Sequence, residues 1–300
     1  MFYRCCLVCN NARYMSKRLG VVGNGNIGAA LGQVFVDDGW RVEYFDTVES
    51  KRTVATLGEL AQKSDVLIIA APSWANRQIA EDMLPEAEGK LVTSVAKGVE
   101  AGFITMDKVL ADVSKGRFDY GVIHGPMLAS EITKGLPAAM TLATTGQQWT
   151  NGFGKNSQLR VEYCDDPYSI ALCGVLKNIY AVALGVNDGL GLGHNAKGAL
   201  AVNILEEFSQ LLSDLGADPK QAYSLSGIGD LLATGWSDLS FNHRIGRLIA
   251  KDPSTEPRGE GITSLKEIGS KIKLSDYPIV YALHKIVFEG AQPQILRQLI

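Results

Sequence analysis

The feature that most constrains this chain is a glycine-rich segment near its start, Gly23-Asn24-Gly25-Asn26-Ile27-Gly28. It follows the apolar run 19–22 and opens a stretch with apolar residues at helical spacing, at Ile27, Leu31, Val34 and Phe35. A strand, a glycine turn and a helix in this order are typical of a Rossmann unit, which binds dinucleotides. The sequence therefore predicts such a unit, with a nicotinamide dinucleotide site, over residues 17–46.

Each residue of this turn has an expected part in holding a cofactor. Gly23 permits the tight turn, Gly25 lets the backbone approach a pyrophosphate, and Gly28 lets helix and strand pack closely. The helix starts at Asn26 and Ile27, where free N–H groups and the positive end of the helix dipole face the phosphates. We expect these five residues to contact the cofactor.

The next predicted strand, 42–45, ends at Asp46, which lies 18 residues after Gly28. A carboxylate at this place accepts hydrogen bonds from the adenosine ribose and repels a 2′-phosphate, which favours NAD over NADP. Two alternatives stay open. Asp46 is a solvated residue at a strand end, or the nearby Lys51 and Arg52 help to bind a 2′-phosphate.

The chain, with 300 residues, is long enough for two domains. Short apolar strands alternate with helical stretches up to residue 164, at 19–22, 42–45, 66–70 and 91–95, with weaker candidates at 122–124, 139–143 and 159–163. This alternation predicts an α/β Rossmann domain over residues 15–165 with a doubly wound, mostly parallel sheet. Pro72 follows the third strand in the loop Ala70-Ala71-Pro72-Ser73, which should border the cofactor.

Residues 166–300 predict an all-helical domain. Two long helices are indicated by apolar residues at helical spacing, the first at Ile170, Val175, Ile179 and Val182 and the second at Leu200, Ile204, Phe208, Leu211 and Leu215. Gly216 suits the end of the second helix, and Asp218-Pro219 suits the start of the next. A charge at Lys177 interrupts the first apolar stretch, so we do not predict a membrane span.

Composition excludes several classes of protein. A net charge of −3 argues against nucleic-acid binding, and the chain has no basic cluster for a membrane surface. The cysteines do not form a disulfide framework, and the one CxxC segment, Cys6-Leu7-Val8-Cys9, has no second ligand pair. Met15 suits a translation start, so we expect residues 1–14 to be a disordered extension, and the protein to be cytoplasmic with reduced thiols.

Lys177 is the only charge between Asp166 and Asp188. A buried ammonium is costly unless it is paired or has a shifted pKa, so a lysine kept there is a functional candidate. It could stabilise and protonate the oxygen of a ketone that receives a hydride. Lys97, in Ser94-Val95-Ala96-Lys97-Gly98, projects from the carboxyl end of a strand, where ligands bind in open α/β sheets. The alternatives are a snorkelling Lys177 and a solvated loop Lys97.

Taken together, the motifs of the chain resemble those of the NAD(P)-dependent glycerol-3-phosphate dehydrogenases, from about residue 18 to residue 281. The matching segments are Ser94-Val95-Ala96-Lys97-Gly98, Gly125-Pro126-Met127-Leu128-Ala129-Ser130-Glu131, Leu176-Lys177-Asn178, the run from Asn187 to Lys197, Gly227-Ile228-Gly229-Asp230-Leu231-Leu232-Ala233-Thr234 and Gly259-Glu260-Gly261. The resemblance implies conversion of dihydroxyacetone phosphate and glycerol 3-phosphate, a helical domain like that of 6-phosphogluconate dehydrogenase, and a homodimer.

The resemblance also implies roles for individual residues. The catalytic group would be Lys177, with Lys97 and Asp230, and Asp230 would pair with Lys177 to offset its burial. The substrate would be bound by residues of both domains, namely Lys97, Asn178, Thr234 and Asn242. Ala129 and Glu260 would contact the cofactor.

The chain departs from the family pattern near the expected substrate phosphate. Phe241 stands where the family has an arginine, which removes a bidentate phosphate donor. Met127 replaces a polar residue, so we expect a less polar substrate pocket, and the segment between residues 46 and 66 is short. We expect Arg244, or else His243, to take over phosphate binding. The other histidines, His124 and His284, have no partners at metal spacing and are expected to be structural.

Two other functions therefore stay open. One is a dehydrogenase of the same fold that acts on a different polyol or hydroxy acid. The other is an NAD-binding sensor that has lost catalysis.

Overall fold

A seven-stranded sheet organises the first half of the chain. The computed structural model describes residues 18–150, 153, 158–252 and 256–300, so the expected extension 1–14 lies outside the described residues. The strands, which include all seven that the sequence predicted, are β1 (Arg18–Val22), β2 (Arg41–Phe45), β3 (Val66–Ile69), β4 (Leu91–Ser94), β7 (Asp119–His124), β8 (Ala138–Thr144) and β9 (Leu159–Cys164). They lie in the order β2-β1-β3-β4-β7-β8-β9.

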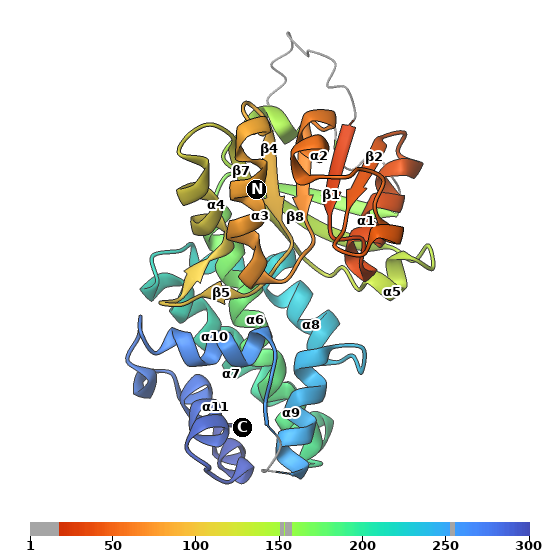
Figure 1. Ribbon diagram of the computed structural model, residues 1–300. Coiled ribbons are helices and arrows are strands. Elements are labelled where there is room, and N and C mark those ends of the chain that lie inside the picture. The colour runs from red at the N-terminus through yellow and green to blue at the C-terminus, as the bar shows by residue number, and fades with distance from the viewer. Residues whose placement is uncertain (1–17, 151–152, 154–157, 253–255) are drawn as a thin grey trace, which may run out of the picture.

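The directions of the strands place the carboxyl ends of the neighbouring parallel strands at one edge of this sheet. The pairs β1–β2, β1–β3, β3–β4 and β4–β7 are parallel. β8 runs antiparallel to β7, and β9 is parallel to β8. The carboxyl ends of β1, β3, β4 and β7 therefore meet at one edge, which faces the helical domain (Figure 1).

Helices cover both faces of the sheet, as a doubly wound fold requires. On one face lie α1 (Asn26–Asp37) and α5 (Ala129–Ile132), and Ile68 of β3 belongs to their hydrophobic core. On the other lie α2 (Leu57–Lys63), α3 (Asn76–Met83) and α4 (Met106–Ser114), where Ile69 packs. Because both faces are covered, β3 is a continuous apolar strand rather than an alternating one. The predicted fold class is confirmed.

A small antiparallel pair, β5 (Val99–Glu100) and β6 (Ile104–Thr105), was not predicted. Each strand has two residues, too few to show the alternation by which a strand is recognised. The pair begins two residues after Lys97 and so lies close to the carboxyl end of β4.

The helical half begins directly after β9. Asp166 caps the first helix by accepting a hydrogen bond from Ser169 N at 3.0 Å. Its α-helices are α6 (Pro167–Gly189), α7 (Gly193–Asp214), α8 (Asp230–Gly235), α9 (Phe241–Lys251), α10 (Glu260–Ile268) and α11 (Pro278–Phe288). Gly216 follows α7 with φ +79°, and Asp218 caps a 3₁₀ helix, Pro219–Tyr223. Among the described residues after 166 no strand is present.

α6 is the central helix of this half. It is long and apolar enough to cross a membrane, but its whole apolar window is buried, as in a core helix. α9 crosses it closely, because Gly185 and Gly246 meet where the helices touch. A Cβ on Gly246 would overlap the carbonyl oxygen of Val182.

The glycine turn joins β1 to α1 as predicted, and its three glycines differ in their surroundings. Gly23 has φ +94°, and a Cβ there would lie 2.5 Å from Ala70 O. A Cβ on Gly28 would overlap Gly23 O, so the absence of a side chain at Gly28 allows the turn to pack closely against the helix. Gly25 has open space where its Cβ would be, with no atom within 4 Å. Its backbone can therefore be approached by a ligand.

This difference separates stability from binding in two single substitutions. We expect Gly28→Ala to lower the free energy of unfolding by about 1–3 kcal/mol, because the added methyl must displace a backbone carbonyl. We expect Gly25→Ala to leave unfolding unchanged but to weaken NADH binding by about tenfold or more, because its methyl fills the approach to the pyrophosphate. Urea titration and NADH fluorescence titration measure the two effects. A Gly25→Ala protein that binds NADH as tightly as the wild type would contradict the assignment.

Candidate active site

The start of α1 has the donors that a pyrophosphate needs. Gly25 is the N-cap of α1, and no side chain caps it. The first N–H groups of the helix, at Asn26, Ile27 and Gly28, therefore have no acceptor within the helix. Free donors, an open approach at Gly25 and the helix dipole together fit the phosphates of a dinucleotide.

Asp46 is fixed beside this turn. Its Oδ2 accepts a hydrogen bond from Asn24 N at 2.8 Å, and its Oδ1 accepts one from Val48 N at 2.8 Å. Each oxygen keeps a lone pair for a ribose hydroxyl. The guanidinium of Arg52 lies 5.7 Å from the centre of the Phe45 ring, so a cation also lies at this end of the site.

Three charged side chains meet where the two domains join. Lys177 comes from α6, Asp230 is the first residue of α8, and Lys97 lies in the loop after β4. Asp230 Oδ1 is 3.2 Å from Lys177 Nζ, and Asp230 Oδ2 is 2.7 Å from Lys97 Nζ. The side chains of Lys177 and Asp230 are 4% and 2% exposed, and that of Lys97 is 17% exposed, so Lys97 is the most accessible of the three.

Burial sets the proton equilibria of this cluster. Loss of solvation lowers the pKa of Lys177 to about 8, against the attraction of Asp230, which raises it. Burial alone would raise the pKa of Asp230, but the charges of Lys177 and Lys97 outweigh it and hold that pKa below its usual value. A carboxylate that stays ionised thus lies beside an ammonium that can lose its proton near neutral pH.

The start of α10 closes on this cluster from the helical side. Glu260 Oε1 lies 3.2 Å from where a Cβ on Gly98 would be, and Glu260 is among the charges that raise the pKa of Lys177. Asn242 Oδ1 accepts a hydrogen bond from Gly261 N at 3.3 Å. Gly261 also lies against the carbonyl oxygen of Asn178, so both asparagines lie beside the start of α10.

Other predicted site residues lie at the edges of this region. Pro72 precedes Ser73, whose side chain packs against Gly98. Ala129 begins α5, which packs against α1. Thr234 is buried one helical turn after Asp230, and its hydroxyl donates to Asp230 O at 2.6 Å.

His243 belongs to a different charged cluster from the lysine pair, and its role as a phosphate ligand stays a prediction. Its ring is buried, and Nε2 lies 2.8 Å from Asp188 Oδ2, which also accepts from Lys197 Nζ at 2.6 Å. Asp188 follows Lys177 by 11 residues on α6, about 16 Å along the helix. Nothing in the spacing of the sequence reveals this second charged cluster.

Arg244 is exposed, and its Nη1 lies 3.4 Å from Asp238 O. Among the described residues it forms no hydrogen bond or ion pair with either lysine of the site, and its role as a phosphate ligand stays a prediction.

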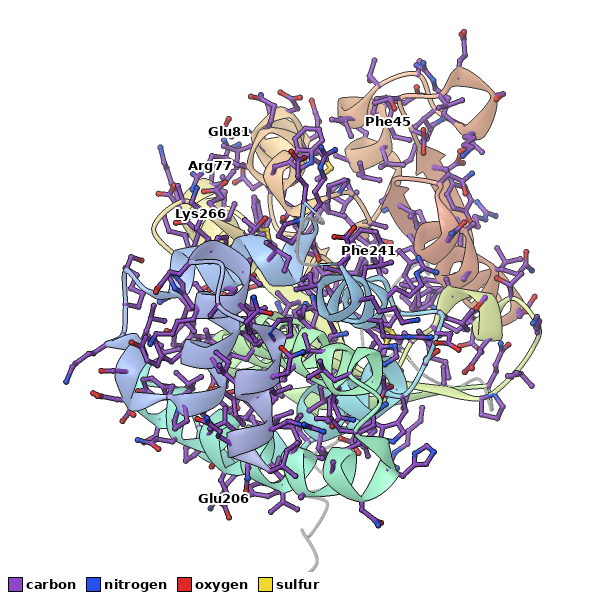
Figure 2. The ribbon with its side chains drawn as sticks, turned by 90° about the horizontal axis from the view of Figure 1, so that it is seen from below. Phe45, Arg77, Glu81, Glu206, Phe241 and Lys266 are labelled. Atoms are coloured by element: carbon purple, nitrogen blue, oxygen red, sulfur yellow. The ribbon has the colours of Figure 1, made fainter. Side chains whose placement is uncertain are left out.

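The two family departures behave differently in three dimensions. Met127 is 8% exposed and packs into the core beneath α1, so it does not make a pocket less polar as expected. Phe241 is 50% exposed and lies against Gly259, since a Cβ there would be 2.7 Å from its ring. Figure 2 shows Phe241 at the margin of the helical domain. An apolar ring therefore stands next to Asn242 and Glu260.

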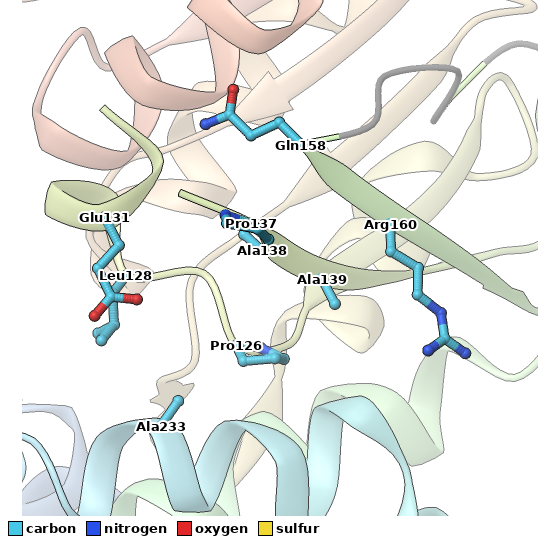
Figure 3. Close-up of a pocket in the computed structure, with 9 residues that line it drawn as sticks. All are labelled: Pro126, Leu128, Glu131, Pro137, Ala138, Ala139, Gln158, Arg160 and Ala233. Atoms are coloured by element: carbon cyan, nitrogen blue, oxygen red, sulfur yellow. The ribbon is translucent and has the colours of Figure 1, made fainter. Parts of the chain in front are cut away.

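A separate pocket of about 380 Å³ lies beyond the loop after β7 (Figure 3). Pro126 and Leu128 line it from that loop, and Ala233 of α8 projects from the opposite side. Glu131 and Arg160 stand on its two flanks. It contains none of the charged residues of the Lys177 cluster, so it adjoins the candidate site without forming it.

Comparison with known proteins agrees with this geometry. A family model described as the NAD-dependent glycerol-3-phosphate dehydrogenase N-terminus matches residues 47–150, and the corresponding C-terminus model matches residues 166–298. The NAD(P)+ glycerol-3-phosphate dehydrogenase of Acinetobacter baumannii (strain ATCC 17978) is 33% identical over 261 residues, which cover 83% of this chain and 73% of the relative. The Streptomyces coelicolor enzyme is 33% identical over 321 residues, with coverage of 94% and 96%.

Solved structures give the same result. The glycerol-3-phosphate dehydrogenase of Coxiella burnetii superposes with a TM-score of 0.82 at 26% identity, over 94% of this chain and 98% of that one. The Saccharomyces cerevisiae enzyme has a TM-score of 0.80 at 17% identity, with coverage of 94% and 98%, and shows the shared fold. Both halves of the chain are thus matched, and the chain belongs to the NAD-dependent glycerol-3-phosphate dehydrogenase family.

Proposed function

We propose that this protein interconverts dihydroxyacetone phosphate and glycerol 3-phosphate with a nicotinamide dinucleotide, and that Lys177 is its catalytic acid and base. The observation that carries the proposal is the cluster of the buried Lys177 and Asp230 with the partly buried Lys97 at the carboxyl end of β4. The relatives named as glycerol-3-phosphate dehydrogenases support the same reaction.

The residues of the cluster have distinct parts in this mechanism. When bound, a reduced nicotinamide would supply the hydride for reduction of the substrate carbonyl. Lys177 donates a proton from Nζ to the carbonyl oxygen as negative charge develops there. The negative charge of Asp230 stabilises the protonated form of Lys177 and so keeps it protonated before the reaction. Because Lys177 is buried, water screens its interaction with the developing negative charge only weakly.

Lys97 is the cation best placed to meet an anionic substrate, since it is the least buried of the three. Asn178 and Asn242 lie beside the start of α10 and offer amide groups for the substrate hydroxyls and phosphate. Thr234 lies within the same helix as Asp230. The substrate would thus contact both domains at once.

We further propose that NAD is the preferred cofactor. Asp46 stands at the adenosine end with a negative charge, which attracts ribose hydroxyls and repels a 2′-phosphate. The described cysteines, Cys164 and Cys173, are free thiols, which supports work in a reducing compartment such as the cytoplasm.

A second candidate is a dehydrogenase of the same fold for a different polyol or hydroxy acid. The exposed ring of Phe241 favours it, because an apolar side chain beside Asn242 offers nothing to a phosphate.

One kinetic comparison decides between these substrates and cofactors. We expect kcat/KM for dihydroxyacetone phosphate to exceed that for dihydroxyacetone by about a hundredfold or more, because the phosphate adds charged contacts. We expect NADH to be preferred over NADPH by about tenfold or more, because Asp46 repels the additional phosphate. NADH or NADPH oxidation followed by absorbance gives both ratios. Equal use of the two ketones would favour the second candidate, and a preference for NADPH would overturn the cofactor assignment.

The pKa of Lys177 predicts how the rate depends on pH. Reduction needs the protonated amine, so its rate should be level below pH 8 and fall as pH rises through about 8, whereas oxidation should rise over the same range. Lys177→Met should lower turnover by about 10³-fold or more while NADH binding survives. Lys266→Met, on the exposed face of α10, is the matched control and should keep full activity (Figure 2). Turnover retained in Lys177→Met, or a reduction rate that rises through pH 8, would refute the role of Lys177.

A further inference from the structure

His124 lies at the junction of the elements that carry the cluster. It is the last residue of β7 and is 1% exposed. Its Nε2 is 3.1 Å from Ala96 O, and its Nδ1 is 3.0 Å from Ile170 O. The ring lies directly against Gly174 of α6, where any side chain would overlap it.

The hydrogen-bond partners of His124 lie on the three chain segments that carry the charged residues of the site. Ala96 directly precedes Lys97 in the loop after β4. Ile170 lies on α6, seven residues before Lys177. The backbone oxygen of His124 accepts a hydrogen bond from Ser226 Oγ at 3.2 Å, four residues before Asp230. One buried residue therefore contacts each of the three segments.

The chemistry of the ring shows which contact is a hydrogen bond. Burial, reinforced by the charge of Lys97, lowers the pKa of His124 to about 4, so the ring is neutral and has one N–H. Both neighbours are carbonyl oxygens, and each can only accept. Ile170 O belongs to α6, whose helical ladder supplies it with an N–H, whereas Ala96 O has no other donor among the described residues. We therefore assign the single ring proton to Nε2, which donates a hydrogen bond to Ala96 O.

The backbone of Ala96, the residue before Lys97, is then held at both its carbonyl and its N–H group. Ala96 N donates to Ser94 Oγ at 3.1 Å, and Ser94 Oγ donates to Asn76 Oδ1 at 2.6 Å. Asn76 Nδ2 in turn donates to Pro72 O at 2.9 Å, in the loop expected to border the cofactor. Since Asn76 and Ser94 are fully buried, water does not compete for these bonds.

We propose that His124 is a positioning residue of this reaction: its Nε2–H holds the carbonyl of Ala96 and so fixes the place where Lys97 meets Asp230. The proposal rests on the proposed function, because Lys97 and Asp230 have their parts in that reaction. His124 itself touches neither substrate nor cofactor. The consequence of losing the bond is a Lys97 that no longer keeps its place beside the carboxylate.

A displaced Lys97 also changes the proton equilibrium of Lys177. The charges that act on Lys177 are Asp230 and Glu260, which raise its pKa, and Lys97, which lowers it. If Lys97 moves away, the opposing positive charge is lost and Asp230 faces Lys177 alone. The pKa of Lys177 then rises, and the fall in the rate of reduction moves to higher pH.

Two amide substitutions at His124 separate positioning from packing. The amide of Gln reaches about as far as Nε2 and can keep the donor to Ala96, whereas the shorter amide of Asn reaches only the Nδ1 position. We expect His124→Asn to raise KM for dihydroxyacetone phosphate about tenfold and to lower kcat. We also expect the fall in the rate of reduction to move to higher pH. We expect His124→Gln to stay within about threefold of the wild type in both constants, and NADH affinity to be unchanged in both. His284→Asn is the matched control, because the ring of His284 on α11 contacts Glu289 and Phe288 and no residue of the cluster.

The outcomes are distinct. A folded His124→Asn protein with the wild-type KM and the wild-type pH dependence of reduction would overturn the proposal. Equal losses of activity in His124→Gln and His124→Asn would also overturn it. If His124→Asn does not fold, Ser94→Ala removes the bond to the N–H group of the same residue, Ala96, and should raise KM in the same direction. An NMR titration of the ¹³Cε of Lys177 reads its pKa without turnover. It tests the effect of His124 even if the wild type does not reduce dihydroxyacetone phosphate, a failure that would count against the proposed function alone.

Discussion

The structure depends on one ionic interaction, the carboxylate of Asp230 between two ammonium groups. A buried charge is tolerated only when it is paired, and here the buried charges of Lys177 and Asp230 are paired with each other and with the partly buried Lys97. Their sources are a loop of the sheet domain and two helices of the other domain. Neither domain holds the cluster alone, because removal of the sheet domain would expose Asp230 and remove Lys97. The docking of the domains and the assembly of the site are therefore one physical event.

Local patterns in the sequence predicted the parts of the fold that local forces determine. The strands of the sheet are recognisable because helices on both faces make them continuously apolar, as in β3. The glycine turn was recognisable because φ +94° at Gly23 and the close packing at Gly28 leave room for no other residue. Lys177 stood out because a single charge inside a long apolar helix must have a partner.

The features that the sequence did not predict depend on where side chains point after folding. Met127 and Phe241 both differ from the family pattern, but only Phe241 reaches the surface beside the site, because Met127 turns into the core beneath α1. His243 follows Asn242 directly, yet it faces Asp188 rather than the lysines. Successive residues on a helix point about 100° apart, so a motif alone does not show which of them reaches the substrate.

The presence of two lysines around one carboxylate is explained by the proposed mechanism. In the proposed mechanism, Lys177 becomes neutral when it gives its proton to the substrate oxygen, and it then no longer compensates Asp230. A buried, unpaired carboxylate would oppose that transfer, since its desolvation is costly. Lys97 holds the second oxygen of Asp230 throughout, so the carboxylate stays paired on both sides of the proton transfer. The pairing of Lys97 therefore makes it possible for a lysine with a pKa of about 8 to act as both acid and base in a buried site.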